Sequence, residues 1–298
     1  MGCEAPGTLR CSRCSKATYC SSACQKRHWR AGHKRVCRSS IAKAARPESM
    51  ECPICMESLV QEASFTYKEC CGGRQCKNCT IRQFSTAGSR RDTLQRCAFC
   101  RAPIASSPDE FESRLLRRHK TGDATGSFML YVCYTRGRFG VERKPTLGLE
   151  MLRAAASRGH PEGLYDLATA RFTGTLRFAD DPLAIHVGQD FEAAVKLYDR
   201  CLELGTCRNH GAALLNRGAI AYQMFDFVTA RRCYLRAAVD HGLKAAMDNL
   251  EDMYRRGHGA IGEADLANIK RQFFEAHHHP RLRTGGRQNT PSPPEYFE

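Results

Sequence analysis

From Asp109 to His278 the apolar positions recur with a helical period, and one pattern returns several times along the chain. Three stretches align with one another: GDATGSFMLYVCYTRG, GHPEGLYDLATARFTG and GLKAAMDNLEDMYRRG. Glycines at positions 122, 159, 205 and 242 mark the repeat, with separations of 37, 46 and 37 residues. The sequence therefore predicts about four helix pairs of about 36 residues over residues 109–278. The longer separation predicts an inserted loop at residues 173–190.

Two kinds of side chain suit such helix pairs. Alanines let neighbouring helices approach closely, and tyrosines fill the gaps between them; they are Ala155, Ala156, Ala237, Ala238, Tyr165, Tyr198, Tyr222 and Tyr234. Stacked pairs form a solenoid, and the pattern resembles Sel-one-like repeats, which are related to the tetratricopeptide repeat. The resemblance implies a concave surface that docks proteins or peptides. The alternative is that the repeats only support the rest of the chain.

Cysteines divide the chain into a front and a rear. Fourteen of the eighteen lie in the first hundred residues, and the other four are predicted to be small core residues of the repeats: Cys133, Cys201, Cys207 and Cys233. The sequence has no apolar run of about 18 residues, and its first residues lack the apolar segment of a secretory signal. We therefore expect a cytoplasmic or nuclear protein without membrane contact, whose C-x2-C pairs bind zinc rather than form disulfides.

Residues 1–38 contain the first candidate zinc module. Its ligands come in pairs at zinc spacing: Cys11 and Cys14, Cys20 and Cys24, His33 and Cys37. The run YCS, CQ, a tryptophan and His-x3-Cys resembles a MYND-type zinc finger, in which two zinc sites interleave. The resemblance implies that the first and third of these pairs form one site and that the second pair belongs to the other.

The second site of this module lacks one ligand. Cys3 fits one member of the family's first ligand pair, and its partner is expected just upstream of the first residue. We therefore expect a three-ligand site of Cys3, Cys20 and Cys24 that binds zinc more weakly. MYND fingers bind peptides, often proline-rich ones, and Gln25 and Trp29 match the family's contact positions. The alternative for Trp29 is that it only packs the small zinc core.

A second candidate module spans residues 51–104, after a linker at residues 39–50. Its eight cysteines form four pairs: Cys52 and Cys55, Cys70 and Cys71, Cys76 and Cys79, Cys97 and Cys100. This order resembles a RING finger, which implies that the first and third pairs hold one zinc ion and the second and fourth pairs another. The adjacent cysteines of the second pair reach one ion only across a kink, which Gly72 and Gly73 permit.

The predicted fold class is therefore small zinc-stabilised modules followed by an all-α helical-repeat solenoid. We expect about four Zn²⁺ ions per chain, one of them in the incomplete site of the MYND-like module.

The RING resemblance also implies a function, which is to hold a ubiquitin-conjugating enzyme in a shallow groove. Ile54 matches the apolar contact inside the first ligand pair, and Ile81 or Phe84 matches the contact on the following helix. Arg101 matches the cation that bridges the conjugating enzyme and ubiquitin, whereas Ala98 stands where the family usually has proline. Because such catalysis is positioning, no residue is assigned covalent chemistry.

The leading hypothesis is a RING-type ubiquitin ligase whose repeats and MYND-like finger recruit substrate proteins. The alternative is a non-enzymatic adaptor that joins partner proteins, since a zinc cross-brace alone does not specify an activity.

The net charge and the C-terminal residues give less information about function. The formal net charge is +15, and residues 1–50 hold eleven Lys and Arg against two Glu. Zinc bound by thiolates lowers the net charge to about +9. Nucleic acid would fit the basic front, but no stacking aromatics accompany it, so a solvated face is favoured. Residues 279–298 are predicted to be disordered, and His277 to His279 to form a solvated helix end rather than a metal site.

Overall fold

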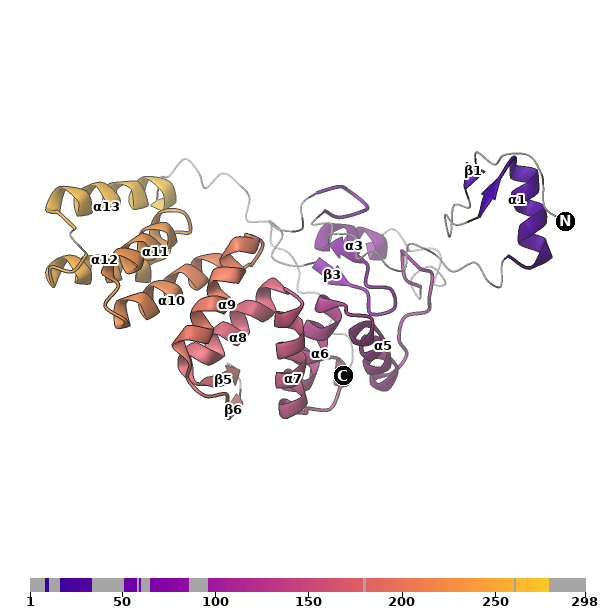
Figure 1. The fold of residues 1–298 in the computed structure, drawn as a ribbon, viewed down its shortest axis with the longest axis horizontal. Helices are drawn as coiled ribbons and strands as arrows, with labels where there is room; N and C mark the ends of the chain where they lie inside the picture. Colours follow the sequence, from indigo (N-terminus) through magenta and orange to yellow (C-terminus); the bar gives the residue numbers. More distant parts are fainter. Residues whose placement is uncertain are drawn as a thin grey trace. The chain divides into compact units, whose positions relative to one another are not determined.

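The computed structural model describes residues 9–10, 17–33, 51–57, 59, 65–85, 96–178, 181–259 and 261–278 (Figure 1). The chain divides into two compact units, residues 1–50 and residues 51–298. The predicted linker at residues 39–50 and the predicted disordered tail at residues 279–298 lie outside the described residues.

The first unit contains a short hairpin and a helix. Strand β1 (Leu9–Arg10) pairs antiparallel with β2 (Thr18–Tyr19), and α1 (Ser22–His28) continues into a π-helical turn, η1 (Trp29–His33). Ser21 caps α1, because its side chain accepts a hydrogen bond from Cys24 N at 3.3 Å. The buried Tyr19 ring packs against Trp29, which gives the described part of this unit a very small core.

The second unit begins with a cysteine-rich module, residues 51–104. Strands β3 (Phe65–Tyr67) and β4 (Arg74–Cys76) pair antiparallel, and α3 (Lys77–Ser85) follows β4 directly. An isolated bridge between Arg96 and Pro103 closes the end of the module. Such short strands bury little apolar surface, so another source of stability is needed.

Helices dominate the rest of this unit, and neighbours in the chain are neighbours in space (Figure 1). The helix α5 precedes the antiparallel pairs α6 with α7, α8 with α9, α10 with α11, and α12 with α13. Their bounds are α5 (Pro108–Lys120), α6 (Ala124–Arg136), η3 (Arg138–Gly140), α7 (Pro145–Ser157), α8 (Pro161–Thr173), α9 (Phe191–Leu204), α10 (His210–Gln223), α11 (Phe227–Val239), α12 (Lys244–Arg255) and α13 (Glu263–His278). The predicted helical-repeat solenoid is confirmed.

Local sequence sets where these helices begin and end. Asp190 and Asp226 accept hydrogen bonds from backbone N–H groups in the first turns of α9 and α11, at 2.9 and 3.0 Å. Gly137 and Gly174 follow α6 and α8 with φ of 64° and 78°, a left-handed conformation that glycine adopts without a steric penalty.

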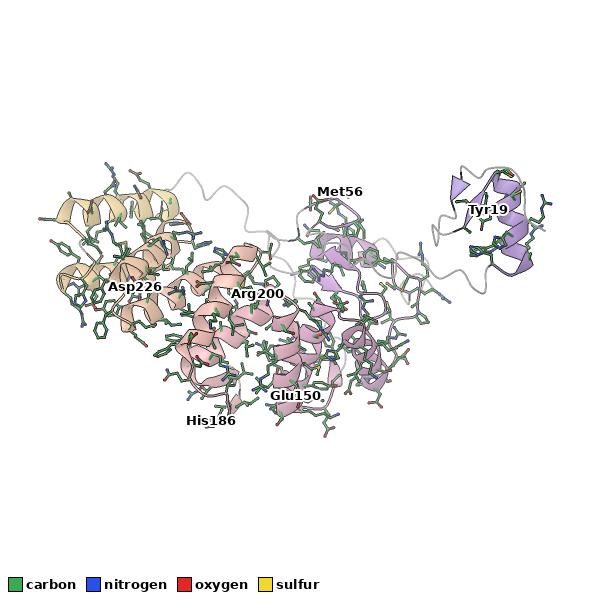
Figure 2. All side chains as sticks on the ribbon, in the orientation of Figure 1. Tyr19, Met56, Glu150, His186, Arg200 and Asp226 are labelled. Carbon is green, nitrogen blue, oxygen red and sulfur yellow. The ribbon has the colours of Figure 1, made fainter. Side chains whose placement is uncertain are left out.

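The helices share an apolar core that runs along the stack. Leu115, Leu130, Leu152 and Leu164 are fully buried among α5 to α8, and a second cluster lies among α10 to α13. Ala155, Ala156, Ala237 and Ala238 are buried at the predicted close approaches, and the four cysteines of the repeats are buried as predicted. The side chains are drawn in Figure 2.

One element differs from its prediction. The insertion after α8 is a hairpin of β5 (Thr175–Phe178) and β6 (Asp181–His186), whereas the sequence predicted a loop. Leu176 anchors it, because that side chain is buried in the core. At the chain end, His277 donates from Nε2 to the Val239 carbonyl oxygen at 2.7 Å, so this histidine ties α13 to α11.

Candidate metal centres

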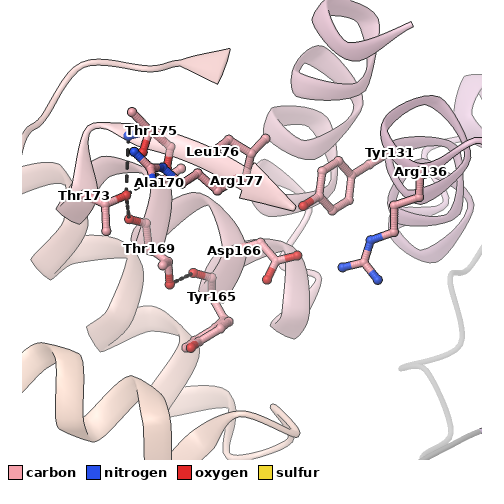
Figure 3. A pocket seen from close by; sticks show the side chains of 10 residues that line it. All are labelled: Tyr131, Arg136, Tyr165, Asp166, Thr169, Ala170, Thr173, Thr175, Leu176 and Arg177. Carbon is pink, nitrogen blue, oxygen red and sulfur yellow. Dashed lines mark hydrogen bonds between the residues drawn. The ribbon is translucent and has the colours of Figure 1, made fainter. Parts of the chain in front are cut away.

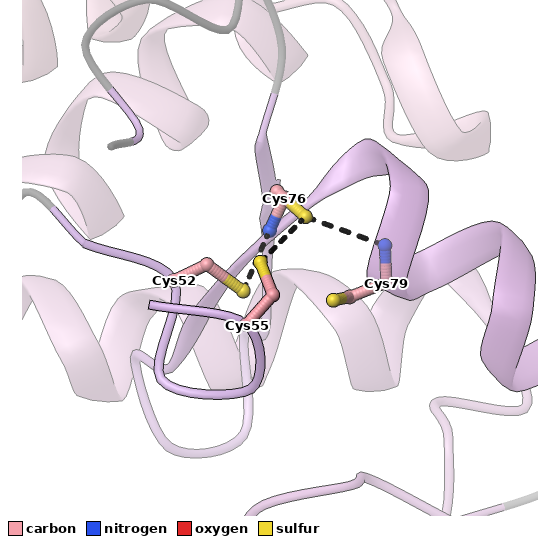
Figure 4. Close-up of side chains that lie close together, drawn as sticks. All are labelled: Cys52, Cys55, Cys76 and Cys79. Atoms are coloured by element: carbon pink, nitrogen blue, oxygen red, sulfur yellow. Dashed lines mark hydrogen bonds between the residues drawn. The ribbon is translucent and has the colours of Figure 1, made fainter. Parts of the chain in front are cut away.

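The first and third cysteine pairs of the cysteine-rich module converge, as Figure 4 shows. The Sγ atoms of Cys52, Cys55, Cys76 and Cys79 all lie within 4.8 Å of one another. Those of Cys55 and Cys76 are 3.6 Å apart. A tetrahedral zinc site with Zn–S bonds of about 2.3 Å has an S–S edge of about 3.8 Å. Four thiols at this spacing, three of them in buried residues, fit a closed structural Zn²⁺ site.

Backbone N–H groups favour thiolates in this cluster. Cys76 N donates to Cys52 Sγ at 3.4 Å, and Cys79 N donates to Cys76 Sγ at 3.3 Å. Burial acts to raise the pKa of the Cys52 thiol, but nearby backbone N–H groups outweigh it and lower that pKa to about 6. Burial and the neighbouring thiols raise the pKa of Cys79. Joint ionisation of the four thiols therefore requires a cation among them.

The second and fourth pairs form another cluster. The Sγ atoms of Cys70, Cys71, Cys97 and Cys100 also lie within 4.8 Å of one another. The Sγ distance is 3.4 Å between Cys70 and Cys100, and 3.8 Å between Cys71 and Cys97. Burial raises the pKa of the Cys71 thiol to about 12. Both clusters therefore bring together the cysteines that the cross-brace pairing predicts, and each can hold a zinc ion.

A tight turn lets two adjacent cysteines face one centre. The N–H groups of Cys71 and Gly72 both donate to the Lys68 carbonyl oxygen, at 3.2 and 2.7 Å. Gly72 has φ of 76°, and Lys68 N donates to the Gly73 carbonyl oxygen at 2.8 Å. The kink that the two glycines were predicted to permit is therefore present at Gly72.

The two C-x2-C turns that open the module and close it have the same backbone shape. Met56 N donates to the Cys52 carbonyl oxygen at 2.7 Å, and Arg101 N donates to the Cys97 carbonyl oxygen at 3.0 Å. Met56 and Arg101 each adopt φ of 62°, a left-handed conformation that is uncommon outside glycine. Each turn thus closes one side of a cysteine cluster and presents the side chain that follows its last cysteine.

Charged side chains fix the cysteine-rich module to α5. Arg114 is nearly buried, donates to Glu69 at 3.0 Å and donates to the Pro103 carbonyl oxygen at 2.7 Å. Glu69 immediately precedes Cys70, so this ion pair holds the second cysteine cluster against the helix.

A second contact reaches α6. Tyr67 donates to Asp123 Oδ2 at 2.7 Å, and Asp123 also caps α6 by accepting from Gly126 N at 3.0 Å. Burial opposes ionisation of Asp123, but these donors and Arg118 outweigh it, so the pKa of Asp123 is lowered. Sequence analysis missed both contacts. An arginine and an aspartate far along the chain from their partners give no local signal.

The first unit shows part of its predicted zinc finger. Cys20 and Cys24 lie with their Sγ atoms 3.3 Å apart at the start of α1. His33 is buried, and Trp29 and Gln25 are half-buried. The predicted ligands Cys3, Cys11, Cys14 and Cys37 lie outside the described residues. Trp29 contacts both Tyr19 and His33, which is consistent with the packing alternative for this side chain.

The described residues that were predicted to contact a conjugating enzyme are exposed. Ile54 is 52% exposed and Ile81 is 49% exposed. Each lies within two residues of a cysteine of the first cluster, Ile54 beside Cys55 and Ile81 after Cys79. Arg101 is also exposed, Ala98 is half-buried, and the side chain of Phe84 lies outside the described residues. Sequence analysis missed Met56, which is 67% exposed in the first turn and is labelled in Figure 2.

These observations define a class: a protein with cysteine-rich centres suited to zinc, followed by a stack of helical repeats. Among the described residues, no helix is long and apolar enough to cross a membrane.

Comparison with known proteins adds a family for the front of the chain. Residues 1–37 match the MYND finger family. Ubiquitin carboxyl-terminal hydrolase 17 of Arabidopsis thaliana is 60% identical over 37 residues, which are 12% of this chain and 5% of the hydrolase. Tudor domain-containing protein 1 of Danio rerio is 37% identical over 79 residues, which are 26% of this chain and 6% of that protein. The chain thus spans only about a twentieth of the length of these relatives.

Two solved structures resemble the chain over 58% of its length. A Sel1 repeat protein from Oxalobacter formigenes is 19% identical with a TM-score of 0.44, over 64% of that chain. The protective antigen c5321 of uropathogenic Escherichia coli, described as an SLR fold, is 23% identical with a TM-score of 0.41, over 34% of that chain. The chain therefore combines a match to the MYND finger family with a stack of helical repeats.

Proposed function

We propose that the chain is a RING-type ubiquitin ligase, in which the cysteine-rich module holds a ubiquitin-conjugating enzyme. The observation that carries this proposal is the pair of exposed isoleucines, Ile54 and Ile81, beside one cysteine cluster. Exposed apolar side chains that flank a rigid centre are suited to docking a protein partner.

The zinc ions of this function are structural. Cys52, Cys55, Cys76 and Cys79 hold one ion in the proposal, and Cys70, Cys71, Cys97 and Cys100 hold a second. In the first unit, Cys11, Cys14, His33 and Cys37 hold a third, and Cys3, Cys20 and Cys24 hold a weaker fourth. The ions fix the two C-x2-C turns, because closed tetrahedral sites contribute folding energy and leave no open position for substrate.

Catalysis then consists of orientation. A conjugating enzyme seated on Ile54 and Ile81 places its ubiquitin thioester near Arg101, whose side chain is exposed on the second C-x2-C turn. A cation at this place can restrain a mobile donor by hydrogen bonds, and holding reactants in a productive geometry lowers the barrier without covalent participation. The repeats and the finger residues Gln25 and Trp29 recruit the protein to be modified.

The test is discharge of ubiquitin from a panel of charged conjugating enzymes by the purified, zinc-loaded full chain. Ile54→Ala and Arg101→Ala are each expected to lower the discharge rate at least about tenfold, as loss of about 1.4 kcal/mol of binding or orientation would do. Ile104→Ala is the matched control, because Ile104 is 48% exposed in the same module but lies four residues beyond the last cysteine.

Two results would count against a ligase. The first is that the folded protein accelerates no enzyme in the panel, and the second is that Ile104→Ala lowers the discharge rate as much as Ile54→Ala does. Either result would favour the adaptor alternative, in which the finger and repeats join partner proteins without transfer chemistry.

A further inference from the structure

A pocket of about 410 Å³ lies in the repeats between α6, α8 and the β5–β6 hairpin (Figure 3). Its volume falls within the range of about 300–1,000 Å³ that is typical of ligand sites. Tyr131 and Arg136 come from α6, Asp166 comes from α8, and Thr175 and Arg177 come from β5. One wall is therefore the insertion that lengthens a single repeat, and insertions in repeat proteins often lie on the binding face.

A carboxylate lies inside this pocket. Asp166 lies near the hydroxyl end of Tyr131 and near the guanidinium group of Arg136 in Figure 3, and Tyr131 acts to lower its pKa. Burial raises the pKa of Asp166 to about 6. Asp166 is therefore mostly ionised at neutral pH, and it keeps lone pairs for a further donor. A buried carboxylate of this kind favours a ligand that brings an N–H group.

Two cations stand at the rim of the pocket. Arg136 and Arg177 are exposed, and among the described residues no carboxylate lies within ion-pair distance of either guanidinium. Arg114, Arg118 and Arg217 in the same unit are each paired with a carboxylate. With Asp166, the pocket carries a net charge of +1, which favours an anionic group.

We propose that this pocket binds an acidic peptide segment of a partner protein: a Glu or Asp side chain lies between Arg136 and Arg177, and a neighbouring main-chain N–H donates to Asp166. Arginine pairs well with carboxylates because its planar donors match the two oxygens. A small dicarboxylate fits less well, because a ligand with oxygens alone repels Asp166. An acidic residue in a peptide supplies the anion and the N–H donor together.

Polar groups continue from the pocket toward α10. Thr169 Oγ1 and the Tyr198 hydroxyl group are 2.9 Å apart, and Asn216 Nδ2 donates to the same hydroxyl group at 3.0 Å. Tyr198 is fully buried and its hydroxyl group is hydrogen-bonded on both sides, so this network joins α8, α9 and α10 behind the pocket wall.

This inference specifies the docking role assigned to the repeats under the proposed function, and its test does not depend on ligase activity. A phage-displayed library of random dodecapeptides is selected on the full chain, with counter-selection on the variant Arg136→Glu, Arg177→Glu. Peptides that bind only the original chain report on the pocket. Peptides that bind the MYND finger also bind the variant, so the counter-selection removes them.

The selected peptides are expected to be enriched in Asp and Glu, and binding is measured by fluorescence polarisation. Arg136→Ala with Arg177→Ala should weaken binding at least about tenfold, because two charge-assisted hydrogen-bond pairs are lost. Asp166→Asn should weaken it about threefold to tenfold. Arg153→Ala is the matched control, since Arg153 is an exposed arginine on α7 outside the pocket, and should change the affinity less than twofold.

Three results would overturn the proposal. The first is that no peptide distinguishes the original chain from the Arg136→Glu, Arg177→Glu variant. The second is that the peptides that do so lack acidic residues, and the third is that replacing their Glu by Gln leaves the affinity unchanged. Circular dichroism and thermal melting of each variant establish that the repeats are folded. A failed discharge assay would reject the ligase function while leaving this binding result intact.

Discussion

The cysteine-rich module, residues 51–104, and the helical repeats, residues 108–278, are held together by different forces. In the module, the described buried apolar cluster consists of Leu59 and cysteines that point at a candidate metal site. In the repeats, buried apolar side chains continue from α5 to α13, and among the described residues no group of potential metal ligands lies there. The first region owes its fold to donor geometry and the second to burial of apolar surface, so the two should fail under different conditions.

Removal of zinc is expected to have the largest effect on stability and, of these two regions, to unfold only the cysteine-rich module. Chelation of the full chain, or the variant Cys76→Ser, should unfold the cysteine-rich module, because a structural zinc site contributes on the order of 10 kcal/mol. The repeats should keep their helical circular dichroism. Zinc content per chain, measured with a colorimetric chelator, should fall by about two ions in Cys76→Ser from about four, because unfolding of the module empties both of its sites.

Cys201→Ser is the control for this prediction, because Cys201 is buried in the repeats away from both clusters. It should leave the zinc content unchanged. Equal zinc content in Cys76→Ser and the original chain would contradict the assignment of the first site, and parallel loss of helix and zinc would contradict the contrast between the two regions.

The two regions also differ in how the sequence predicts them. Ligand spacing predicted cysteines that bind metal, and the RING resemblance implied how they group into two clusters. The periodic glycines predicted the helix pairs, because a left-handed residue ends helices such as α6 and α8. Both signals are local. The helix pairs are confirmed, and the structure brings the cysteines into two clusters that can each hold a zinc ion.

The features that the sequence did not predict are contacts between residues that lie far apart in the chain. Arg114 and Glu69 are 45 residues apart, and nothing near either residue indicates the other. The pocket around Asp166 needs α6, α8 and the hairpin together, and the insertion gave only the position of an irregularity. A hairpin and a loop of equal length differ in strand pairing, which the glycine spacing does not encode.

The ion pair that joins the two regions should give the next largest effect. Arg114→Met leaves Glu69 nearly buried without its partner, since the two side chains are only 7% and 11% exposed. We expect a loss of about 3–5 kcal/mol in the free energy of unfolding. Denaturation by urea, with zinc kept in excess, measures it.

Two comparisons sharpen the test of this ion pair. The double variant Arg114→Met, Glu69→Gln should recover part of the loss, because the buried Glu69 charge is removed and the other partner of Arg114, Glu110, is 40% exposed. Arg217→Met breaks the pair with Asp199, which is 48% exposed, and should cost less than about 1 kcal/mol. Equal losses for Arg114→Met and Arg217→Met would show that the module is not fixed to α5 as described.

A smaller effect concerns pH and the repeats alone. Burial raises the pKa of Asp166 to about 6 from the model-compound value of 3.8, so between these values the folded state binds more protons than the unfolded state. Stability therefore falls as pH rises through this window, by about 3 kcal/mol. Asp166→Asn should remove this dependence, so the variant gains stability relative to the original chain at pH 7 but not at pH 4.

The difference between the two proteins at each pH is the quantity to measure, because pH-dependent zinc release affects both equally and cancels. A constant difference from pH 4 to pH 7 would mean that Asp166 does not titrate in this range. The neighbouring Arg136, Arg208 and Glu162 influence Asp166 in both directions and are unchanged in the variant.

The smallest expected effect concerns the end of α10, where, among the described residues of the repeats, a phenylalanine takes the place that glycine has after the other helices. Gly137, Gly174 and Gly257 follow α6, α8 and α12 with φ between 64° and 78°, whereas Phe225 stands at the corresponding place after α10 with φ of 61°. A side chain in this conformation costs about 1–2 kcal/mol. The Phe225 ring is 80% exposed and recovers little of that cost by burial.

Phe225→Gly should therefore stabilise the repeats, by about 0.5–1 kcal/mol after the greater chain entropy of glycine in the unfolded state is subtracted. Gly137→Phe is the reverse change at an equivalent turn and should destabilise by about 1–2 kcal/mol. Thermal melting followed by circular dichroism measures both variants. A destabilised Phe225→Gly would mean that the exposed ring makes contacts that outweigh the backbone strain. A stabilised one means that the protein retains a strained, exposed phenylalanine where its own repeats use glycine, which is the pattern expected when a side chain is kept for a partner.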